Sequence, residues 1–387
     1  MPLTETTAKT ILRKQKQLDS WFCSSYAMNL YRGCAHNCAY CDGRSEGYYA
    51  PENFSSDIEV KVNAPDILRR ELDPARKRKP MRPGFVLLGG GVNDCYQPAE
   101  AKYLLARQAL ELILEYGHPV HVLTKATLVE RDFDLLSTIN RQSKAILSVS
   151  ISTADDETAS YFEPLAPPPS ERLALLKKAK TAGLSCGVYL LPIIPFITDK
   201  PEMLDSSFRV ARDAGADFII FGGMTLKDGR QREHFMQALA VHEAALGDAG
   251  HVSEALSHQY DILYSGDRWG NPVPQYTSML HELLFTAARR YGISVRMPPS
   301  LFGPVLDING RIQAMLEHLD YIQRSRGMKS TYGYAARGIA NLKGPVSGMR
   351  DRLRQINGIG PATERMIKEM IDTGTCPIYD RAIRCKY

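Results

Sequence analysis

The chain has 387 residues, of which 44% are hydrophobic and 24% are charged, with a formal net charge of +5. This length predicts two or three domains, and the composition is that of an ordinary soluble globular protein whose mild charge does not by itself indicate nucleic acid. No run of 18 or more apolar residues offers a membrane span, and residues 1–16 contain no apolar signal-peptide core, so we expect a cytoplasmic protein without a membrane partner.

Residues 1–25 form a predicted basic N-terminal segment. Its first part carries Lys9, Arg13, Lys14 and Lys16, and we interpret it as a short solvated arm. Residues 26–31 are then predicted to be a first strand, whose C-terminal end leads into a cluster of cysteines. Later, residues 67–82 form a basic loop for which a phosphate contact and a solvated face both remain open.

Three cysteines follow the first predicted strand with the spacing C-x3-C-x2-C, namely Cys34, Cys38 and Cys41. Three thiolates on one short loop can hold three irons of a 4Fe-4S cluster and leave the fourth iron open to another ligand. A zinc site fits less well, because it would show four Cys or His ligands as two separated pairs. The spacing, with Tyr40 directly before the third cysteine, resembles the radical S-adenosylmethionine (SAM) superfamily, in which SAM chelates the open iron.

This resemblance implies a 4Fe-4S cluster and SAM as cofactors, Tyr40 beside them, and an electron donor such as flavodoxin or ferredoxin. The total of eight cysteines, three of them crowded on one loop, also suits a reducing compartment and a metal better than a disulfide framework. The other five are predicted to be mostly buried thiols: Cys23, Cys95, Cys186, Cys376 and Cys385.

Beyond residue 83 the chain repeats a helical stretch, a glycine and a short apolar strand, which is typical of βα units. The strands are predicted at residues 85–88, 120–123, 145–151, 187–191 and 218–221. Together with the first strand they make six parallel strands that are buried on both faces. We therefore predict an α/β fold with a partial (β/α)6 barrel at residues 26–225, and chemistry at the ends of its strands.

Several residues that follow the predicted strands are candidates for a SAM pocket. Three consecutive glycines after the second strand let the backbone approach a ligand closely, although a plain tight turn would also explain them. Lys125, at the end of the third strand, is expected to bind the SAM carboxylate. The predicted cofactor-binding residues of these strand ends are Gly89, Gly90, Gly91, Asn93, Lys125 and Ser152.

Further segments narrow the resemblance. Asp94-Cys-Tyr-Gln-Pro-Ala-Glu100, Thr124-Lys125 and the stretch from Glu163-Pro164 to Arg172 look like the spore photoproduct lyase-like branch of radical SAM proteins. The resemblance implies reductive cleavage of SAM to methionine and a 5′-deoxyadenosyl radical, which abstracts hydrogen from a substrate. In the lyases that substrate is a thymine photodimer in DNA, so a lyase reaction in DNA repair is implied.

Two residues near the cofactors bear on this comparison. Cys95 occupies a place comparable to that of the cysteine that returns a hydrogen atom in the lyases, which makes it a catalytic candidate. A small residue that merely fills the strand end is the alternative. Asp42 departs from the lyases, which have an aromatic residue directly after the third cysteine.

The remainder is predicted to be a mostly helical extension at 226–345 and a separate C-terminal segment at 346–387. In the last segment two apolar helical stripes flank Asn357-Gly-Ile-Gly-Pro361, which resembles a helix-hairpin-helix motif. Such glycines leave amide N–H groups exposed at a helix start, where a phosphate can bind. The candidate nucleic-acid contacts are Gly358, Gly360, Arg365 and Lys368, and a hairpin used only for packing is the alternative.

The sequence therefore favours a radical SAM enzyme that acts on DNA or RNA, with a DNA lesion as one substrate. A nucleic-acid-binding iron-sulfur protein without SAM turnover is a second hypothesis. It is less favoured, because a structural cluster needs no open iron, glycine-rich loop or positioned lysine. A third hypothesis keeps the SAM chemistry and gives it a protein or small-molecule substrate.

Overall fold

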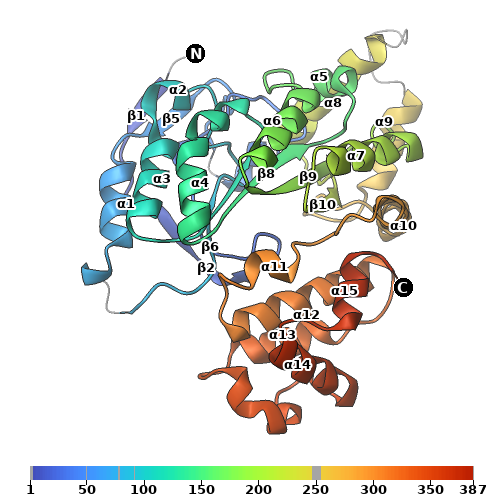
Figure 1. Cartoon of the computed structure of the whole chain (residues 1–387). Helices are drawn as coiled ribbons and strands as arrows, with labels where there is room; N and C mark the ends of the chain where they lie inside the picture. The colour runs from blue at the N-terminus through green and yellow to red at the C-terminus, as the bar shows by residue number, and fades with distance from the viewer. Residues whose placement is uncertain (1–2, 49, 77–78, 91, 246–253, 387) are drawn as a thin grey trace.

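The computed structural model describes residues 3–48, 50–76, 79–90, 92–245 and 254–386. A curled seven-stranded sheet with helices on its outer side forms the main body, and a bundle of C-terminal helices lies beneath it (Figure 1). The predicted α/β fold with a partial barrel is confirmed. None of the helices within these ranges is long and apolar enough to cross a membrane.

Six strands of this sheet are parallel to one another and follow one another in chain order. Short runs of apolar residues form them, and nearly all of their side chains are buried, because helices cover one face and the barrel core fills the other. The strands are β3 (Ser24–Met28), β6 (Phe85–Leu88), β7 (Val120–Thr124), β8 (Ala145–Ile151), β9 (Ser185–Ile193) and β10 (Phe218–Gly223).

The N-terminal residues do not form the solvated arm that we predicted. β2 (Leu12–Asp19) pairs antiparallel with β3 and becomes the seventh strand of the barrel sheet. Glu71 holds its start, because the carboxylate accepts the backbone N–H groups of Ile11 (3.1 Å) and Leu12 (2.7 Å). A second, three-stranded sheet contains β1 (Leu3–Thr6), β5 (Ile58–Lys61) and β4 (Tyr31–Arg32).

The connections between the parallel strands are mostly helical, and their helices lie outside the sheet (Figure 1). A helical arm, α9 (Glu254–Leu263) and α10 (Pro274–Tyr291), then leads from the barrel toward the C-terminal bundle. The helices around the sheet are α1 (Ala64–Leu72), α2 (Glu100–Tyr103), α3 (Leu105–Glu115), α4 (Phe133–Gln142), α5 (Asp156–Phe162), α6 (Pro169–Thr181), α7 (Pro201–Asp213) and α8 (Arg230–Ala245).

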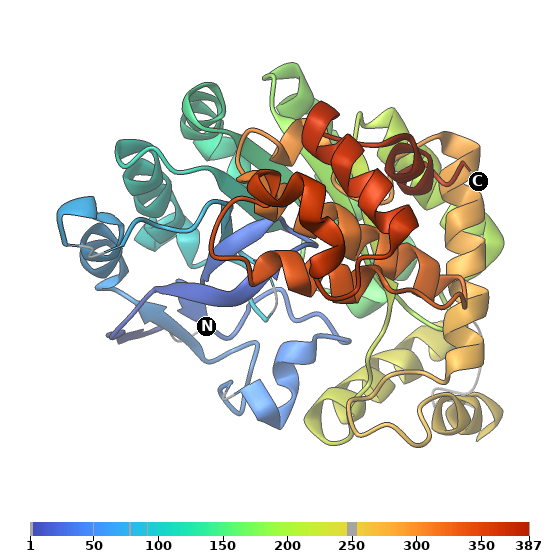
Figure 2. The ribbon, with the colours of Figure 1, turned by 90° about the horizontal axis from the view of Figure 1, so that it is seen from below.

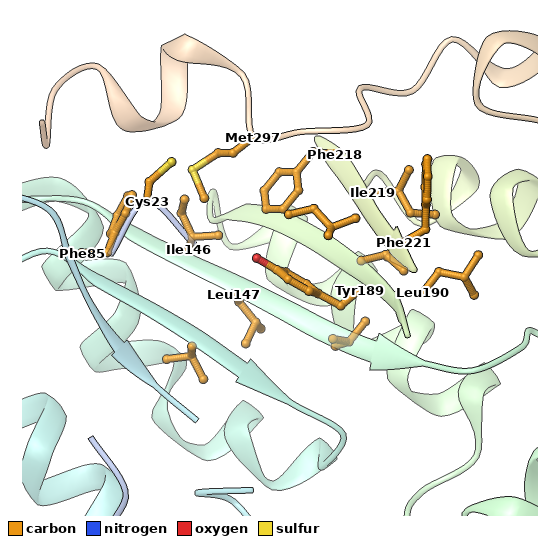
Figure 3. Close-up of a cluster of buried hydrophobic side chains, with 14 of the residues drawn as sticks. Cys23, Phe85, Ile146, Leu147, Tyr189, Leu190, Phe218, Ile219, Phe221 and Met297 are labelled. Atoms are coloured by element: carbon orange, nitrogen blue, oxygen red, sulfur yellow. The ribbon is translucent and has the colours of Figure 1, made fainter. Parts of the chain in front are cut away.

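The C-terminal bundle packs against the end of the barrel at which the strands begin (Figures 1 and 2). His318 Nε2 lies 2.8 Å from the carbonyl oxygen of Ser20, just before β3, and Ser294 forms a β-bridge with Phe218 at the start of β10. Met297 lies beside Cys23 and Phe218 over the same end (Figure 3). The bundle comprises α11 (Pro299–Phe302), α12 (Ile308–Ser325), α13 (Tyr332–Ala340), α14 (Pro361–Thr373) and α15 (Pro377–Ile383).

One part of this bundle differs from the prediction. Residues Val346–Gln355 form 3-10 helical turns with a kink at Arg352, instead of the α-helix that the apolar stripe indicated. Gly348 lowers the α-helical propensity there, while Val346 and Leu353 are still fully buried. A single buried apolar cluster extends through all four predicted segments, and their status as separate domains stays a prediction.

Candidate active site

The cysteine loop is held by hydrogen bonds from distant parts of the chain. The backbone N–H of Cys34 donates to Phe54 O (3.0 Å). Gln97 binds the loop twice, because its Nε2 donates to Gly33 O (3.2 Å) and its Oε1 accepts from Ala35 N (2.9 Å). Gly33 has a φ of +76°, and a Cβ there would lie 2.8 Å from Phe54 O. The turn into the cysteines therefore requires glycine.

A cavity of about 340 Å³ lies at the end of the barrel where the parallel strands finish. The three motif cysteines and Tyr40 are in its wall. Its inner side includes Phe22 and Tyr189, whose rings stack with centroids 4.9 Å apart. Each of the strands from β6 to β10 contributes a residue at or near its end, among them Gly90, Lys125, Ser150, Leu191 and Gly223. The cysteine motif and the strand ends thus share one cavity.

Glu163, which follows α5, is buried and collects four polar side chains around its carboxylate. Its Oε1 accepts hydrogen bonds from Tyr40 OH, from Ser152 Oγ (2.7 Å) and from Lys125 Nζ (3.1 Å). Arg172 Nη2 lies 2.5 Å from Oε2. Burial alone would raise the pKa of Glu163, but the charges of Lys125 and Arg172 hold it below its ordinary value. The ionised carboxylate therefore fixes Tyr40 and Lys125 beside the cysteines.

The three motif cysteines are free thiols in one cavity wall, and they have the chemistry of iron-cluster ligands. Burial raises the pKa of Cys38 to about 12 and also raises the pKa values of Cys34 and Cys41, so their thiolates need a positive charge close by, which metal ions supply. Within the described ranges no three His, Cys, Asp or Glu side chains could hold a single metal ion. A 4Fe-4S cluster differs in this respect, because each cysteine binds a different iron.

The cavity also presents polar atoms that would suit SAM. Asn93 Nδ2 donates to Tyr31 O (2.7 Å), while its Oδ1 is buried and has no partner among the described residues. Lys125 Nζ donates to Glu163 and to Ser150 Oγ (3.3 Å), which leaves one of its three N–H donors for a ligand. A molecule that carries both an amino group and a carboxylate would satisfy the amide oxygen and the ammonium.

Asp94 joins the cysteine loop to the end of β7. Its carboxylate accepts hydrogen bonds from Thr124 Oγ1 (2.7 Å) and Lys125 N (2.7 Å) and lies 3.3 Å from His36 Nε2. Burial alone would raise the pKa of Asp94, but His36 and the backbone N–H groups hold it below its ordinary value. The contact with His36 was not predicted, because nothing local in the sequence relates the two residues.

The segment after β10 packs on the other side of the cysteine loop. Lys227 Nζ lies 2.5 Å from Asp42 Oδ1. Gln231 is fully buried at the start of α8, and its Nε2 donates to Tyr40 O (3.0 Å). Arg230 and Arg232, which flank it, form ion pairs with Glu46 and Asp261. The side chain of this segment that touches the cysteine loop is therefore that of the glutamine between the two arginines.

Four of the predicted cofactor-binding residues line the cavity, namely Tyr40, Gly90, Asn93 and Lys125. Gly89 lies next to it with a φ of +77°, and a Cβ there would come within 2.3 Å of Leu123 O. Ser152 reaches the site indirectly, through its hydrogen bond to Glu163. Gly91 falls outside the residues that the structure describes.

Cys95 is 1% exposed and is not among the described residues that line the cavity. A Cβ on Gly89 would lie 3.1 Å from Cys95 Sγ, so the glycine stands beside the thiol at the end of β6. Burial raises the pKa of Cys95 well above its ordinary value, which keeps the S–H bond that a hydrogen-atom donor needs. Its catalytic role stays a prediction.

The hairpin residues of the C-terminal segment have different surroundings. Gly358 packs against α13, and a Cβ there would lie 2.7 Å from Ala335 N. Gly360 is exposed directly before α14, with no atom within 4 Å of a Cβ. Arg365 is exposed, and Lys368 pairs with a glutamate one turn earlier on the same helix (3.0 Å). The structure does not bring these residues to the cysteine cavity, and their binding to nucleic acid stays a prediction.

Sequence comparison places the chain among known proteins. The model of the radical SAM superfamily matches residues 28–208. Uncharacterized protein Rv2578c of Mycobacterium tuberculosis is 33% identical over 273 residues, which are 70% of this chain and 75% of the relative. Uncharacterized protein ORF301 of Acidianus two-tailed virus is 33% identical over 222 residues, which are 55% of this chain and 71% of that protein.

Solved structures agree with this placement at the level of the fold. Spore photoproduct lyase complexed with dinucleoside spore photoproduct superimposes with a TM-score of 0.52 at 18% identity, and the match covers 75% of this chain and 79% of that one. A mutant of the same lyase with bound AdoMet and dinucleoside spore photoproduct gives a TM-score of 0.54 with the same coverage. The fold, the superfamily match and the related sequences together show that this chain belongs to the radical SAM superfamily.

Proposed function

We propose that the protein binds a 4Fe-4S cluster through Cys34, Cys38 and Cys41 and cleaves SAM reductively. The observation that carries this proposal is the shared cavity, in which the three thiols face the free donor of Lys125 and the unpartnered Oδ1 of Asn93. When bound and reduced by a donor such as flavodoxin or ferredoxin, the cluster supplies the electron that splits SAM into methionine and a 5′-deoxyadenosyl radical.

The residues of this chain would then bind and orient the sulfonium substrate. Lys125 would hold the SAM carboxylate by a charge-assisted hydrogen bond, and Asn93 Oδ1 would accept a hydrogen bond from the ligand. Glu163 would keep both Lys125 and Tyr40 in position. The stacked rings of Phe22 and Tyr189 exclude water from the inner wall, which protects a reactive radical from side reactions.

For the substrate, we infer a nucleic acid and a lyase-like reaction on a DNA lesion. Two observations support this inference. The exposed Gly360 precedes α14 as the helix-hairpin-helix resemblance requires, and the solved structures that share the fold include a lyase with a bound dinucleoside photoproduct. In such a reaction Cys95 would return a hydrogen atom to the product.

Anaerobic reconstitution with iron and sulfide, followed by an assay for 5′-deoxyadenosine with dithionite, tests the SAM chemistry. The parent should form 5′-deoxyadenosine, and the variant with Cys34, Cys38 and Cys41 all changed to Ala should lose both its iron and the product. Cys186→Ala, in the core of the sheet, is the matched control and should keep both. Full iron content in the triple variant would refute the assignment.

The substrate is tested separately, by adding ultraviolet-damaged or undamaged DNA to the same assay. Damaged DNA should increase the rate of 5′-deoxyadenosine formation or cause its reuse, and undamaged DNA should not. If neither DNA changes the product while SAM is still cleaved, the SAM chemistry stands and the nucleic-acid substrate is rejected.

A further inference from the structure

A second cavity, of about 700 Å³, lies along the open side of the partial barrel. It is bounded by the end of β10 and by helices α10 and α12. It shares wall residues with the cofactor cavity at the strand ends, namely Leu191, Gly223, Met224 and Thr225. The two cavities therefore meet where β9 and β10 finish, and a molecule in the second would lie next to a ligand in the first.

A buried polar atom in this wall lacks a partner. His281 of α10 is 8% exposed, and its Nε2 lies 3.2 Å from Tyr321 OH of α12. Its Nδ1 has no hydrogen-bond partner among the described residues. Burial lowers the pKa of His281 to about 4, so the ring is neutral at pH 7 and offers one donor and one acceptor. Such an atom is costly until a ligand pairs with it.

The charged residues that line this cavity are Glu317, Asp320 and Arg324, and the guanidinium of Arg296 lies behind its aromatic wall. Arg324 pairs with Asp320 at 2.8 Å. Glu317 accepts hydrogen bonds from Gln313 Nε2 (2.9 Å) and from the side chain of Ser20, and no Lys or Arg of the described residues forms an ion pair with it. Burial raises the pKa of Glu317. A partly desolvated carboxylate of this kind fits an N–H donor on a neutral group better than a phosphate.

The second cavity also has aromatic side chains in its wall and the start of a helix at its rim. Trp21 and Tyr321 lie in the wall, and the buried guanidinium of Arg296 stacks on both rings, at 5.1 Å and 3.8 Å from their centroids. Aromatic walls with a few polar groups suit a planar heterocycle. Pro274 and Thr277 bring the first turn of α10 to the same cavity, where the positive end of the helix dipole favours a negative group.

The position of α12 connects this cavity to the C-terminal bundle. His318 of α12 contacts Tyr379 of α15 and Ser20, at the start of the barrel strands. One turn further, Tyr321 of the same helix lies in the wall of the second cavity. The bundle that carries the hairpin is therefore joined by one continuous helix to a cavity that opens toward the cofactors.

We propose that this second cavity is the substrate chamber and that it takes the base of a nucleotide. His281 and Glu317 would read the hydrogen-bonding edge of the base, Trp21 and Tyr321 would contact its ring, and the phosphate would lie at the rim near the first turn of α10. This inference rests on the proposed nucleic-acid substrate. It specifies that the base of that substrate enters the second cavity and that the phosphate stays at the rim near the first turn of α10.

Equilibrium dialysis tests the proposal on the anaerobically reconstituted protein with SAM and without reductant. The probes are radiolabelled thymidine, thymidine 5′-monophosphate and the tripeptide Gly-Lys-Gly. Thymidine should bind, the monophosphate should bind about two- to five-fold more tightly because of the helix dipole, and the tripeptide should not bind. Tripeptide binding without nucleoside binding would overturn the proposal in favour of a protein substrate.

Variants on α10 and α12 locate the binding. Ser278→Phe places a ring in the cavity from an exposed position of α10 and should weaken thymidine binding about ten-fold or more, and Glu317→Gln should do the same by removing a charged acceptor. Met279→Phe is the matched control, because Met279 is the next residue, is 49% exposed and does not line the cavity. It should bind thymidine like the parent.

The outcomes separate this inference from the proposed function. A parent that forms no 5′-deoxyadenosine with dithionite would contradict the proposed SAM chemistry itself. A parent that cleaves SAM but binds no thymidine, or a Ser278→Phe variant that binds it like Met279→Phe, would overturn only the substrate chamber.

Discussion

Lys125 Nζ lies 3.1 Å from Glu163 Oε1, while Arg172 approaches the other oxygen of the same carboxylate to 2.5 Å. The two cations differ in their surroundings, because Arg172 is fully buried and the Lys125 side chain is 12% exposed at the cofactor cavity. Glu163 therefore has one partner that is enclosed by the protein and one that reaches the cavity. Variants of Lys125 and Glu163 should separate binding of SAM from stability of the fold.

Lys125→Ala should weaken SAM binding by about 1.5–3 kcal/mol, because a hydrogen bond to a charged group is lost. The fold should be retained, since Glu163 keeps Arg172, Tyr40 and Ser152. Equilibrium dialysis with labelled SAM measures the change. Lys178→Ala, at an exposed ion pair with Glu130, is the control and should bind like the parent. Equal dissociation constants for all three proteins would remove Lys125 from the pocket.

Glu163→Gln should act mainly on stability. It leaves the guanidinium of Arg172 buried without a carboxylate, and breaking a buried pair in this way costs about 3–5 kcal/mol. Urea denaturation of the cluster-free protein measures the free energy of unfolding. Glu130→Gln removes an exposed partner and should cost less than about 1 kcal/mol. Similar losses in the two variants would show that the buried network does not stabilise the barrel.

The hairpin should be tested at Gly360 alone. Gly360→Val adds a side chain at an exposed helix start without a clash and should weaken binding of double-stranded DNA at low salt, measured by fluorescence anisotropy. The parent's affinity should fall steeply with salt if phosphates are bound. Gly358→Val is unsuitable as a binding test, because its φ of +85° and its contact with α13 predict a destabilised bundle. Unchanged affinity in a well-folded Gly360→Val variant would leave the hairpin as a packing element.

Buried histidines predict a loss of stability in mild acid. Burial lowers the pKa values of His121 and His281 to about 4 and that of His318 to about 3. Between pH 6.5 and 4 the unfolded chain therefore binds protons that the folded chain does not, so stability present above pH 6.5 is lost as the pH falls. Thermal unfolding of the cluster-free protein, followed by circular dichroism, should show this fall.

His318→Gln provides the comparison for that pH dependence. It removes one titrating group between the bundle and the barrel and should reduce the slope of the melting temperature against pH between 6.5 and 4. A slope equal to that of the parent would show that His318 does not contribute.

Four of the six parallel strands, namely β6, β7, β9 and β10, could be predicted because each is a short apolar run that follows a glycine, which is a local pattern. β2 could not be predicted in this way, since Leu12 and Leu18 are its only apolar residues and the strand is specified by its pairing with β3. Likewise, Val346 and Leu353 are buried, as the apolar stripe in residues 346–355 predicts. The spacing of apolar residues alone, however, does not distinguish a 3-10 helix from an α-helix.

In the site, the cysteines and Lys125 could be proposed from spacing and from the rule that strand ends carry chemistry. Glu163 was noticed only within a motif, and its four partners come from different parts of the chain. Gln231 offered no signal, because a glutamine between two arginines resembles a solvated helix start. These contacts depend on tertiary packing, which no local pattern encodes.

The exposed basic residues of β2 have a consequence for self-association. β2 forms one margin of the seven-stranded sheet, and Arg13, Lys14 and Lys16 project from it into solvent. An edge strand with unpaired backbone groups can pair with the edge strand of another molecule. Lysine and arginine side chains oppose such pairing through charge repulsion and the cost of desolvation. We therefore expect these basic residues to hinder the joining of sheets from neighbouring molecules, and replacing the three with threonine should make the folded protein aggregate at low ionic strength.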